Sequence, residues 1–557
     1  MAHRSPIAQL ATHAVTNQPP DFAPRDLYAT DLALREAVQR EGAAWAGEAL
    51  GVLGAEAGSE RVVEWGEQAN RNPPVLKTFD RYGRRIDEVE FHPAYHALME
   101  LAMRHRVHSI AWTAGAWTAA RPGGHVAHAA MGYMLTQWEA GVLCPVAMTY
   151  AAVPALRHQP DVAAEWVPRI LSDRYDPRMI PASEKTGVTV GMAMTEKQGG
   201  SDVRANTTRA RRDGDGAAYR LTGHKWFCSA PMSDAFLTLA QTDKGLSCFL
   251  VPRWTPDGER NPFLIQRLKD KLGNRSNASS EIEYADTWAL PVGEEGRGVA
   301  TIIDMVHHTR LDTSFAAAGL MRAALAQALH HTRHRTAFQK RLSDQPLMRA
   351  VLADMALEVE AAIALLFRVA RAFDEGEKDP AARAFARLAV AVAKYWLNKR
   401  CPNLVYEAME CHGGGGYVEE GPLPRLYREA PLNSIWEGSG NVICLDVLRT
   451  LEKEPAALAA LTADLGAARG LDARLDRWVE HTGALFADRA NQEARARLLV
   501  ERTALALQAG LLLRHAPPAV AEAFCASRLG NEGGRAYGTL PPGLDLEAIL
   551  GRAAGEA

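Results

Sequence analysis

One glutamate lies in a segment whose residue types suit acid–base catalysis. Glu437 lies between Trp436 and Gly438 in residues 433–441, Asn-Ser-Ile-Trp-Glu-Gly-Ser-Gly-Asn. Ahead of it, residues 410–417 read Glu-Cys-His-Gly-Gly-Gly-Gly-Tyr, and such glycines let the backbone approach a ligand without side-chain obstruction. A carboxylate enclosed in this way can take up a proton as a general base. The alternative is a structural carboxylate at a helix N-terminus, held there by the helix dipole.

Three further strings suit a ligand that contains phosphate. Residues 194–202, Met-Thr-Glu-Lys-Gln-Gly-Gly-Ser-Asp, offer hydroxyls and backbone N–H groups to anionic oxygens. Residues 224–229, His-Lys-Trp-Phe-Cys-Ser, offer an indole ring, and residues 335–338, Arg-Thr-Ala-Phe, offer a guanidinium that can bind a phosphate through two parallel hydrogen bonds. Taken singly, the first string also fits a polar loop, and the tryptophan of the second also fits a protein core.

Together these strings resemble those of the acyl-CoA dehydrogenases, in which a G-G-x-G-Y/F run precedes an aromatic-Glu-Gly turn by a similar interval. The resemblance implies FAD as the cofactor, Glu437 as the base and Arg310 as a second residue of the catalytic site. The residues that it assigns to FAD binding are Met194, Thr195, Gly200, Ser201, Trp226, Cys228, Ser229, Arg335, Phe338, Glu410, Gly413, Gly414, Trp436, Gly438, Ser439 and Asn441.

The reaction implied by this resemblance is α,β-dehydrogenation of a short or branched acyl-CoA thioester. A base removes the α proton, and the β hydrogen leaves as hydride to the flavin, because protein side chains cannot accept hydride. Enclosure by Trp436, flavin and acyl chain would raise the pKa of Glu437 toward the range useful for a base. Some family members carry their base on a helix immediately before an arginine. That position is Thr309, before Arg310, so Glu437 has no competitor.

Two positions depart from the family pattern. Cys228 replaces a threonine that contacts the flavin, and because a thiol is a weak hydrogen-bond partner, we expect that contact to pass to Ser229 or to the backbone. His307 stands where the family commonly has an aspartate, which indicates an altered pantetheine channel. His307 and His308 point about 100° apart on a helix and have no apparent third ligand, so we expect no metal site.

A narrower resemblance is to the AidB group of adaptive-response flavoproteins. It rests on residues 194–202, 269–279, 424–429 and 436–441, and runs from about Pro73 to the C-terminus. It implies a homotetramer with FAD at the subunit boundaries, weak isovaleryl-CoA dehydrogenase activity, and binding to double-stranded DNA in the response to alkylation damage. Two alternatives therefore stand: an acyl-CoA dehydrogenase, or a DNA-binding protein in which dehydrogenation is secondary.

The C-terminal segment, to which this resemblance assigns the DNA surface, is not basic. Residues 451–557 contain 12 Lys and Arg against 14 Asp and Glu. Phosphate neutralisation dominates non-specific DNA affinity, so such a segment binds DNA only if its arginines gather on one face. The candidates for that face are Arg489, Arg495, Arg497, Arg502 and Arg514. The alternative is an ordinary solvated helix surface.

The elements that must position these residues follow a helix, strand, helix order. Helical periodicity covers about 31–181, strand-like runs occur within 191–291, and helical periodicity returns after Gly298. We expect an α+β protein with the acyl-CoA dehydrogenase fold: an N-terminal extension and helical domain (1–185), a β-barrel-like domain (186–295), a helical bundle (296–450) and an additional C-terminal helical domain (451–557). The first unit should be mostly α, and the last should end in a Pro/Gly-rich tail near 530–543.

Composition sets the remaining limits. The 557 residues are 47% apolar and 23% charged, as in ordinary globular proteins, and the net charge of -3 gives no general affinity for nucleic acid. Seven scattered cysteines without a C-x-x-C pair indicate reduced thiols in a cytoplasmic protein. No apolar stretch reaches the length of a bilayer span, so we expect no membrane association.

Overall fold

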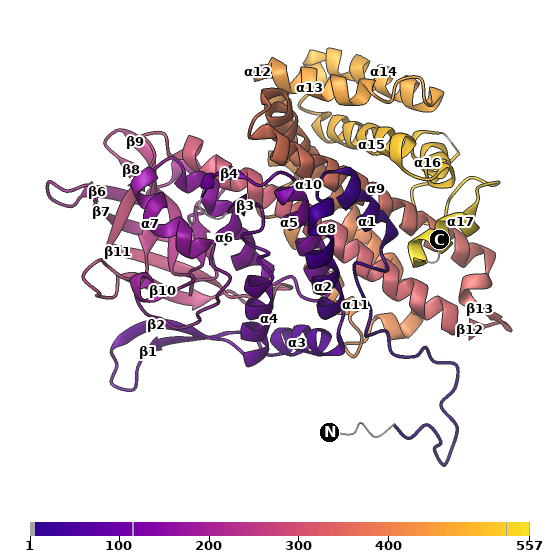
Figure 1. Cartoon of the computed structure of the whole chain (residues 1–557), viewed down its shortest axis with the longest axis horizontal. Helices are drawn as coiled ribbons and strands as arrows, with labels where there is room; N and C mark the ends of the chain where they lie inside the picture. Colours follow the sequence, from indigo (N-terminus) through magenta and orange to yellow (C-terminus); the bar gives the residue numbers. More distant parts are fainter. Residues whose placement is uncertain (1–5, 114–115, 531, 556–557) are drawn as a thin grey trace.

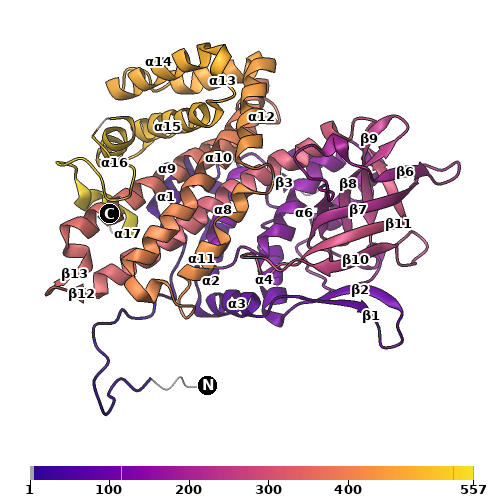
Figure 2. The same ribbon diagram turned by 180° about the vertical axis from the view of Figure 1, so that it is seen from behind.

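The computed structural model describes residues 6–113, 116–530 and 532–555. Helices form most of the molecule, and a β domain projects from one side of it (Figure 1). The view from behind shows the same division, with the last helices of the chain stacked on the side of the bundle away from the hairpin β1–β2 (Figure 2). This order of helical domain, β domain and helical bundle confirms the expected fold class.

The N-terminal region contains seven helices among its described residues. They are α1 (Leu32–Arg40), α2 (Gly47–Ala57), α3 (Glu60–Arg71), α4 (Pro93–Arg104), α5 (Gly124–Thr136), α6 (Leu143–Leu156) and α7 (Pro160–Ile170). Local sequence sets several starts: the Ser59 hydroxyl accepts from the Val62 N–H ahead of α3, and Pro93 occupies the first position of α4, where its missing N–H costs nothing.

Strands interrupt this region, which the sequence predicted to be mostly α. An antiparallel hairpin of β1 (Val75–Phe79) and β2 (Arg85–Glu90) separates α3 from α4, and the short pair β3 (Trp112–Thr113) and β4 (Ala116–Ala120) precedes α5. The hairpin turn is built by the Asp80 carboxylate, which accepts from the backbone N–H groups of Tyr82 and Arg84. A prediction from helical periodicity alone overlooked this aspartate-anchored turn.

The β domain is a seven-stranded sheet that closes on itself. Its strands are β5 (Val190–Ala193), β6 (Arg209–Arg212), β7 (Tyr219–Ser229), β8 (Ala235–Thr242), β9 (Gly245–Pro252), β10 (Phe263–Leu268) and β11 (Ser279–Val292). Because β9 pairs with both β11 and β8, the strands β11, β7, β6, β8 and β9 form a ring. This ring is the expected barrel-like architecture, and apolar side chains from its strands form a separate core inside it.

Three long helices form the bundle: α8 (Gly298–His334), α9 (Pro346–Gly376) and α10 (Pro380–Cys411). The short hairpin of β12 (Thr336–Ala337) and β13 (Lys340–Arg341) follows α8, and α11 (Leu423–Glu429) and α12 (Gly440–Lys453) follow α10. Most residues of α10 between 388 and 398 are buried on all sides, which matches their almost unbroken apolar sequence. Glu437 lies in the connection between α11 and α12.

The C-terminal helices are α13 (Pro455–Gly466), α14 (Ala473–Ala487), α15 (Ala496–His515), α16 (Pro518–Phe524) and α17 (Leu546–Ala554). One apolar core includes side chains from these helices, from the bundle and from α1 to α5. The segment expected to end in a tail instead continues into α17, and Arg552 of this helix forms ion pairs with Glu36 and Glu360. The prediction of a tail from glycine and proline content was wrong. The apolar face of α17 packs against the main core, and this packing holds the segment in place.

Candidate active site

The turn that carries Glu437 has an unusual backbone. Glu437 has a φ of 57° and Gly438 a φ of 100°, so two successive residues are left-handed. A residue with a side chain in this region carries strain of about 1–3 kcal/mol, and such strain concentrates at functional sites. Trp436 enters the turn with its indole N–H bonded to the Asn433 side-chain oxygen at 2.8 Å. The strained backbone therefore directs the Glu437 side chain away from the path of α12.

The Glu437 carboxylate is bound by the helix α8. Its Oε2 accepts a hydrogen bond from the Thr309 hydroxyl at 2.8 Å, and Nε of Arg310 donates to the Glu437 carbonyl at 3.2 Å. Burial raises the pKa of Glu437, and the Thr309 hydroxyl together with the charges of Arg310 and Lys394 oppose that rise. These contacts give the carboxylate a defined partner outside α12, in contrast to a glutamate that merely caps a helix.

Arg310 is fixed by a second layer of charge. Its guanidinium pairs with Asp446 of α12 at 2.8 Å, and Arg387 of α10 pairs with the same carboxylate at 2.7 Å. His307, one position ahead of His308 on α8, faces this group, and burial lowers its pKa well below the ordinary value. The helices α8, α10 and α12 thus meet at the base of the Glu437 turn.

The loop at 194–202 is anchored by a buried ion pair that sequence reasoning did not single out. Glu196 is fully buried and accepts from Lys225 Nζ at 2.9 Å and from the Thr207 N–H at 2.7 Å. Lys225 of β7 also donates to the Leu239 carbonyl at 2.8 Å. A signal was present: alternation from Tyr219 places Lys225 on the inward face of its strand, where a lysine requires a carboxylate.

This loop and the tryptophan predicted to bind flavin lie side by side. The backbone N–H of Trp226 donates to the Thr195 carbonyl at 2.7 Å. The Asn206 side-chain amide donates to the Met194 carbonyl at 2.9 Å. The Lys269 ammonium lies 3.3 Å from the centre of the Trp226 ring. Gly200 and Ser201 continue the same loop, with Gly200 close against Thr195.

Cys228 and Ser229 point in different directions. The Cys228 side chain is fully buried in the core of the barrel, and burial raises the pKa of its thiol to about 12. Ser229 is half-buried, and its hydroxyl lies 3.1 Å from that of Ser279. The thiol faces the barrel core, so the expectation that the Cys228 side chain contacts the cofactor is wrong. The two alternatives left by the sequence, the Ser229 hydroxyl and the backbone, both stand.

The glycine run forms a short 3₁₀ turn, Gly413–Gly416, after α10. A Cβ at Gly413 or Gly414 would meet no atom within 4 Å, whereas one at Gly416 would collide with the Met409 carbonyl at 2.2 Å. Glu410, one turn earlier on α10, is exposed. The first part of the run thus borders open space, as expected for backbone that a ligand can approach, and its last glycine is needed for packing.

Arg335 and Phe338 lie far from Glu437 within one chain. Thr309 and Arg335 are separated by about two thirds of the helix α8, about 39 Å at 1.5 Å per residue. Arg335 donates to the Asn17 carbonyl of the N-terminal arm at 2.6 Å, and Phe338 is 93% exposed on the β12–β13 turn. These two residues cannot contact the ligand region around Glu437 of their own subunit.

The five C-terminal arginines do not form one free face. Arg495 pairs with Asp488 at 2.7 Å and Arg514 with Asp464 at 3.6 Å. Arg497 donates to the side chain of Asn441, four residues after Glu437, at 2.8 Å. Arg489 lies in a short 3₁₀ turn, Arg489–Asn491.

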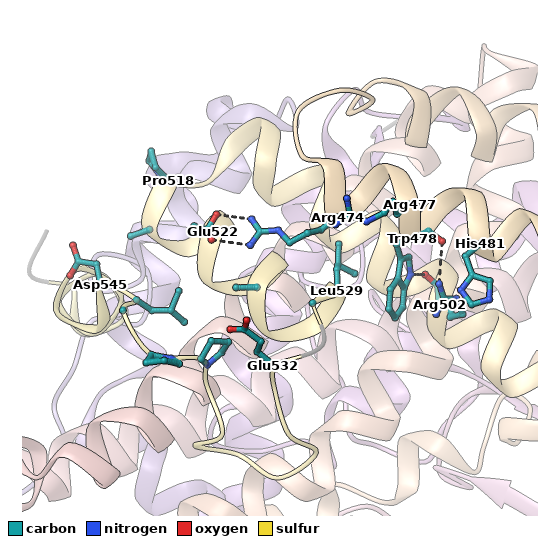
Figure 3. A pocket seen from close by; sticks show the side chains of 17 residues that line it. Arg474, Arg477, Trp478, His481, Arg502, Pro518, Glu522, Leu529, Glu532 and Asp545 are labelled. Atoms are coloured by element: carbon teal, nitrogen blue, oxygen red, sulfur yellow. Dashed lines mark hydrogen bonds and ion pairs between the residues drawn. The ribbon is translucent and has the colours of Figure 1, made fainter.

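Arg502 stacks on Trp478, with 3.6 Å between the guanidinium carbon and the ring centre. It borders a cavity of about 1090 Å³ among α14, α16 and the loop before α17 (Figure 3). Both signs of charge line this cavity: Arg474 points to Glu522, and the carboxylates of Glu532 and Asp545 also border it (Figure 3). The cavity is therefore polar but not an electropositive channel.

Across 6–113, 116–530 and 532–555, His, Cys, Asp and Glu side chains form no group of three or more that could hold a metal ion. In the same part of the chain, none of the helices is long and apolar enough to cross a bilayer.

Comparisons with known proteins show the family to which the chain belongs. Sequence profiles of the acyl-CoA dehydrogenase middle and C-terminal domains match residues 191–287 and 296–452, and the profile of the adaptive response protein AidB N-terminal domain matches residues 17–177. The solved structure of Caenorhabditis elegans ACDH-11, in complex with C11-CoA, superposes with a TM-score of 0.82 and 27% identity, covering 99% of this chain and 95% of that one. The apo-form of Bd2924 has a TM-score of 0.81 and 30% identity, over 91% of this chain and 100% of that one.

The fold and these matches define an oxidoreductase of the acyl-CoA dehydrogenase class, which acts on CH–CH donors and uses FAD. AidB of Escherichia coli (strain K12) is 47% identical over 524 residues, which cover 94% of this chain and 95% of that protein. The chain therefore belongs to the AidB group of the acyl-CoA dehydrogenase family.

Proposed function

We propose that this protein dehydrogenates a short or branched acyl-CoA thioester between its α and β carbons, with Glu437 as the base. The observation that carries the proposal is the bonding of the Glu437 carboxylate to Thr309, beside Arg310, on a turn whose left-handed backbone directs it away from α12. Its raised pKa suits a group that must take a proton from carbon, because a base works best when its pKa lies close to the operating pH.

The cofactor supplies the hydride acceptor when bound, and the residues near it have separable tasks. Trp226, Ser229 and the 194–202 loop would hold the flavin beside Glu437 of the same chain. Gly413 and Gly414 follow His412, whose ring lies 4.4 Å from that of His331 near the end of α8, so their open backbone would serve, like Arg335, the cofactor of a neighbouring subunit. Arg310 fixes the carbonyl of Glu437 and is itself fixed by Asp446.

The direct test of this function is anaerobic mixing with a panel of acyl-CoA thioesters. Isovaleryl-CoA and other short or branched members represent the proposed substrates, and an eleven-carbon member represents the ligand of the ACDH-11 structure. We expect bleaching of the oxidised flavin spectrum by at least one short or branched thioester. If none of the panel reduces the flavin, the proposed function is wrong. Reduction by the longer thioester alone would change the substrate class and leave the reaction type standing.

We also propose that the protein is a homotetramer in which FAD lies at subunit boundaries. Arg335 and Phe338 are too distant from the Glu437 turn to serve the same ligand within one chain, and Phe338 exposes 93% of its surface. Further exposed large side chains, Tyr417 (82%) and Ile435 (64%), flank the glycine run and the Glu437 turn. An exposed apolar surface of this kind is typical of contacts between subunits.

Replacing Phe338 with Ala tests this boundary. Loss of one aromatic contact should weaken FAD binding by about 1 kcal/mol, roughly five-fold. The FAD content per chain should fall on dilution while secondary structure is unchanged. Phe79→Ala is the matched control, because Phe79 is also exposed (56%) but lies on the β1–β2 hairpin. Equal FAD retention by the two variants would contradict the assignment.

The alternative function is DNA binding in the response to alkylation damage. Four of its five candidate arginines are engaged by Asp488, Asp464, Asn441 or Trp478, so we expect no continuous cationic surface in this segment. We therefore favour dehydrogenation as the main activity. Binding to duplex DNA that weakens steeply as salt increases would favour the alternative.

A further inference from the structure

Lys394 is a buried lysine that has no assigned role in the proposed dehydrogenation. It lies on α10, within a stretch whose side chains are almost all apolar, and is 1% exposed. A lysine in such a place requires a partner, because transfer of an ammonium group from water is costly. Its Nζ donates to the carbonyl oxygen of Gly438. In the described part of the chain, Lys394 forms no ion pair with a carboxylate at hydrogen-bonding distance.

The two carbonyls of the left-handed turn are therefore held by two cations from different helices. Arg310 of α8 binds the carbonyl of Glu437, and Lys394 of α10 binds that of Gly438. Two successive left-handed residues persist only when the surroundings impose them. The paired cations supply that constraint from opposite sides of the turn.

The two cations differ in their other partners. Arg310 is paired with Asp446, a carboxylate that it shares with Arg387, and its charge also favours the ionised form of Glu437. Lys394 binds a neutral carbonyl and keeps its charge beside the carboxylate. The charged groups around Lys394 are Glu437, Arg310 and Lys399, and Asp312 lies near Glu437 as well. Of these, Asp312 is engaged by His128 at 2.7 Å.

We propose that Lys394 is the positioning residue of the catalytic base: it holds the Glu437–Gly438 turn and sets the pH at which the carboxylate becomes able to accept a proton. This inference rests on the assignment of Glu437 as base. Removal of the Lys394 charge withdraws stabilisation from the ionised carboxylate, so the pKa of Glu437 should rise. Burial lowers the pKa of Lys394 to about 7, so Lys394 is charged across the acidic range where a raised carboxylate titrates.

The test is a pH titration of the bound flavin's absorbance, without any acyl-CoA, in the full-length holoprotein. The wild type should show a transition that is absent in Glu437→Gln. In Lys394→Met, which keeps most of the length of the side chain but removes the charge, the midpoint should move upward by about one pH unit. In Lys394→Arg the midpoint should stay with the wild type. Lys453→Met, an exposed lysine on α12, is the matched control and should change nothing.

The rate of flavin reduction gives a second readout. Below the midpoint, an upward shift of one unit leaves about ten-fold less ionised base, so Lys394→Met should be about ten-fold slower at low pH and recover as pH rises. An unchanged midpoint in a Lys394→Met protein with full FAD content would overturn the proposal. If the midpoint moves but no acyl-CoA reduces the wild-type flavin, the proposed function fails while the control of the Glu437 pKa by Lys394 stands.

Discussion

Glu437→Gln should slow the reduction of FAD by acyl-CoA by about 10²- to 10⁴-fold, the usual contribution of a positioned general base. Glutamine has the same shape and can still accept from Thr309, but it cannot take the α proton. Substrate binding should change little. Stopped-flow measurement of flavin bleaching under anaerobic conditions gives the rate constant directly.

The pH dependence of the wild type supports this prediction. Burial raises the pKa of Glu437 above the ordinary 4.5, so the base is protonated at low pH and the rate should increase as pH rises through that shifted value. The Glu437→Gln variant should lack this increase. Glu452→Gln, a change on the exposed surface of α12, is the control. A Glu437→Gln rate within three-fold of wild type would mean that another group removes the proton.

Lys225→Met should destabilise the β domain by about 3–5 kcal/mol, because it leaves a buried carboxylate without its cation. Glu196 and Lys225 have fully buried side chains, and their charged atoms are 2.9 Å apart. The remaining partners of Glu196 are neutral groups such as the Thr207 N–H. Since Glu196 lies in the loop assigned to flavin binding, FAD should be released at the same lower temperature. Thermal unfolding followed together with flavin fluorescence measures both effects.

An exposed ion pair provides the comparison for this variant. Lys77 and Glu90 pair at 3.3 Å on the β1–β2 hairpin with both side chains largely in solvent. Lys77→Met should cost less than about 1 kcal/mol. Adding Glu196→Gln to Lys225→Met should restore part of the lost stability, because the buried site is then uncharged. Equal effects of Lys225→Met and Lys77→Met would show that the buried pair contributes no more than a surface pair.

The buried ion pair of Glu196 and Lys225 also predicts that the protein loses stability at acid pH. Burial raises the pKa of Glu196, but hydrogen bonds from Thr208 and Thr207 and the charge of Lys225 outweigh it, so the pKa lies well below the ordinary 4.5. A carboxylate with a depressed pKa contributes its full stability above pH 4.5 and loses that contribution as pH falls further. The wild-type unfolding temperature should therefore decline below about pH 4.5.

Contacts between neighbours in sequence were the most predictable part of the site. Three segments are each encoded within a few consecutive residues: the loop at 194–202, the glycine run and the Trp436-Glu437-Gly438 turn. The backbone conformations open to glycine and the order of neighbouring side chains are local properties, so the sequence indicates them directly. For the same reason the helix, strand, helix order followed from periodicity. The β1–β2 hairpin within a mostly helical region was not predicted, and the prediction of a tail near 530–543 overlooked α17.

What only the tertiary structure decided is which distant groups meet. The sequence by itself determined the fold, the family's motifs and Glu437 as the candidate base. Helix packing brings Lys394 to the carbonyl of Gly438 and Arg497 to Asn441, and strand orientation turns Cys228 inward while Ser229 stays accessible. These outcomes depend on how faces of separate helices and strands are packed against each other, and the spacing of residues along one chain does not specify that packing.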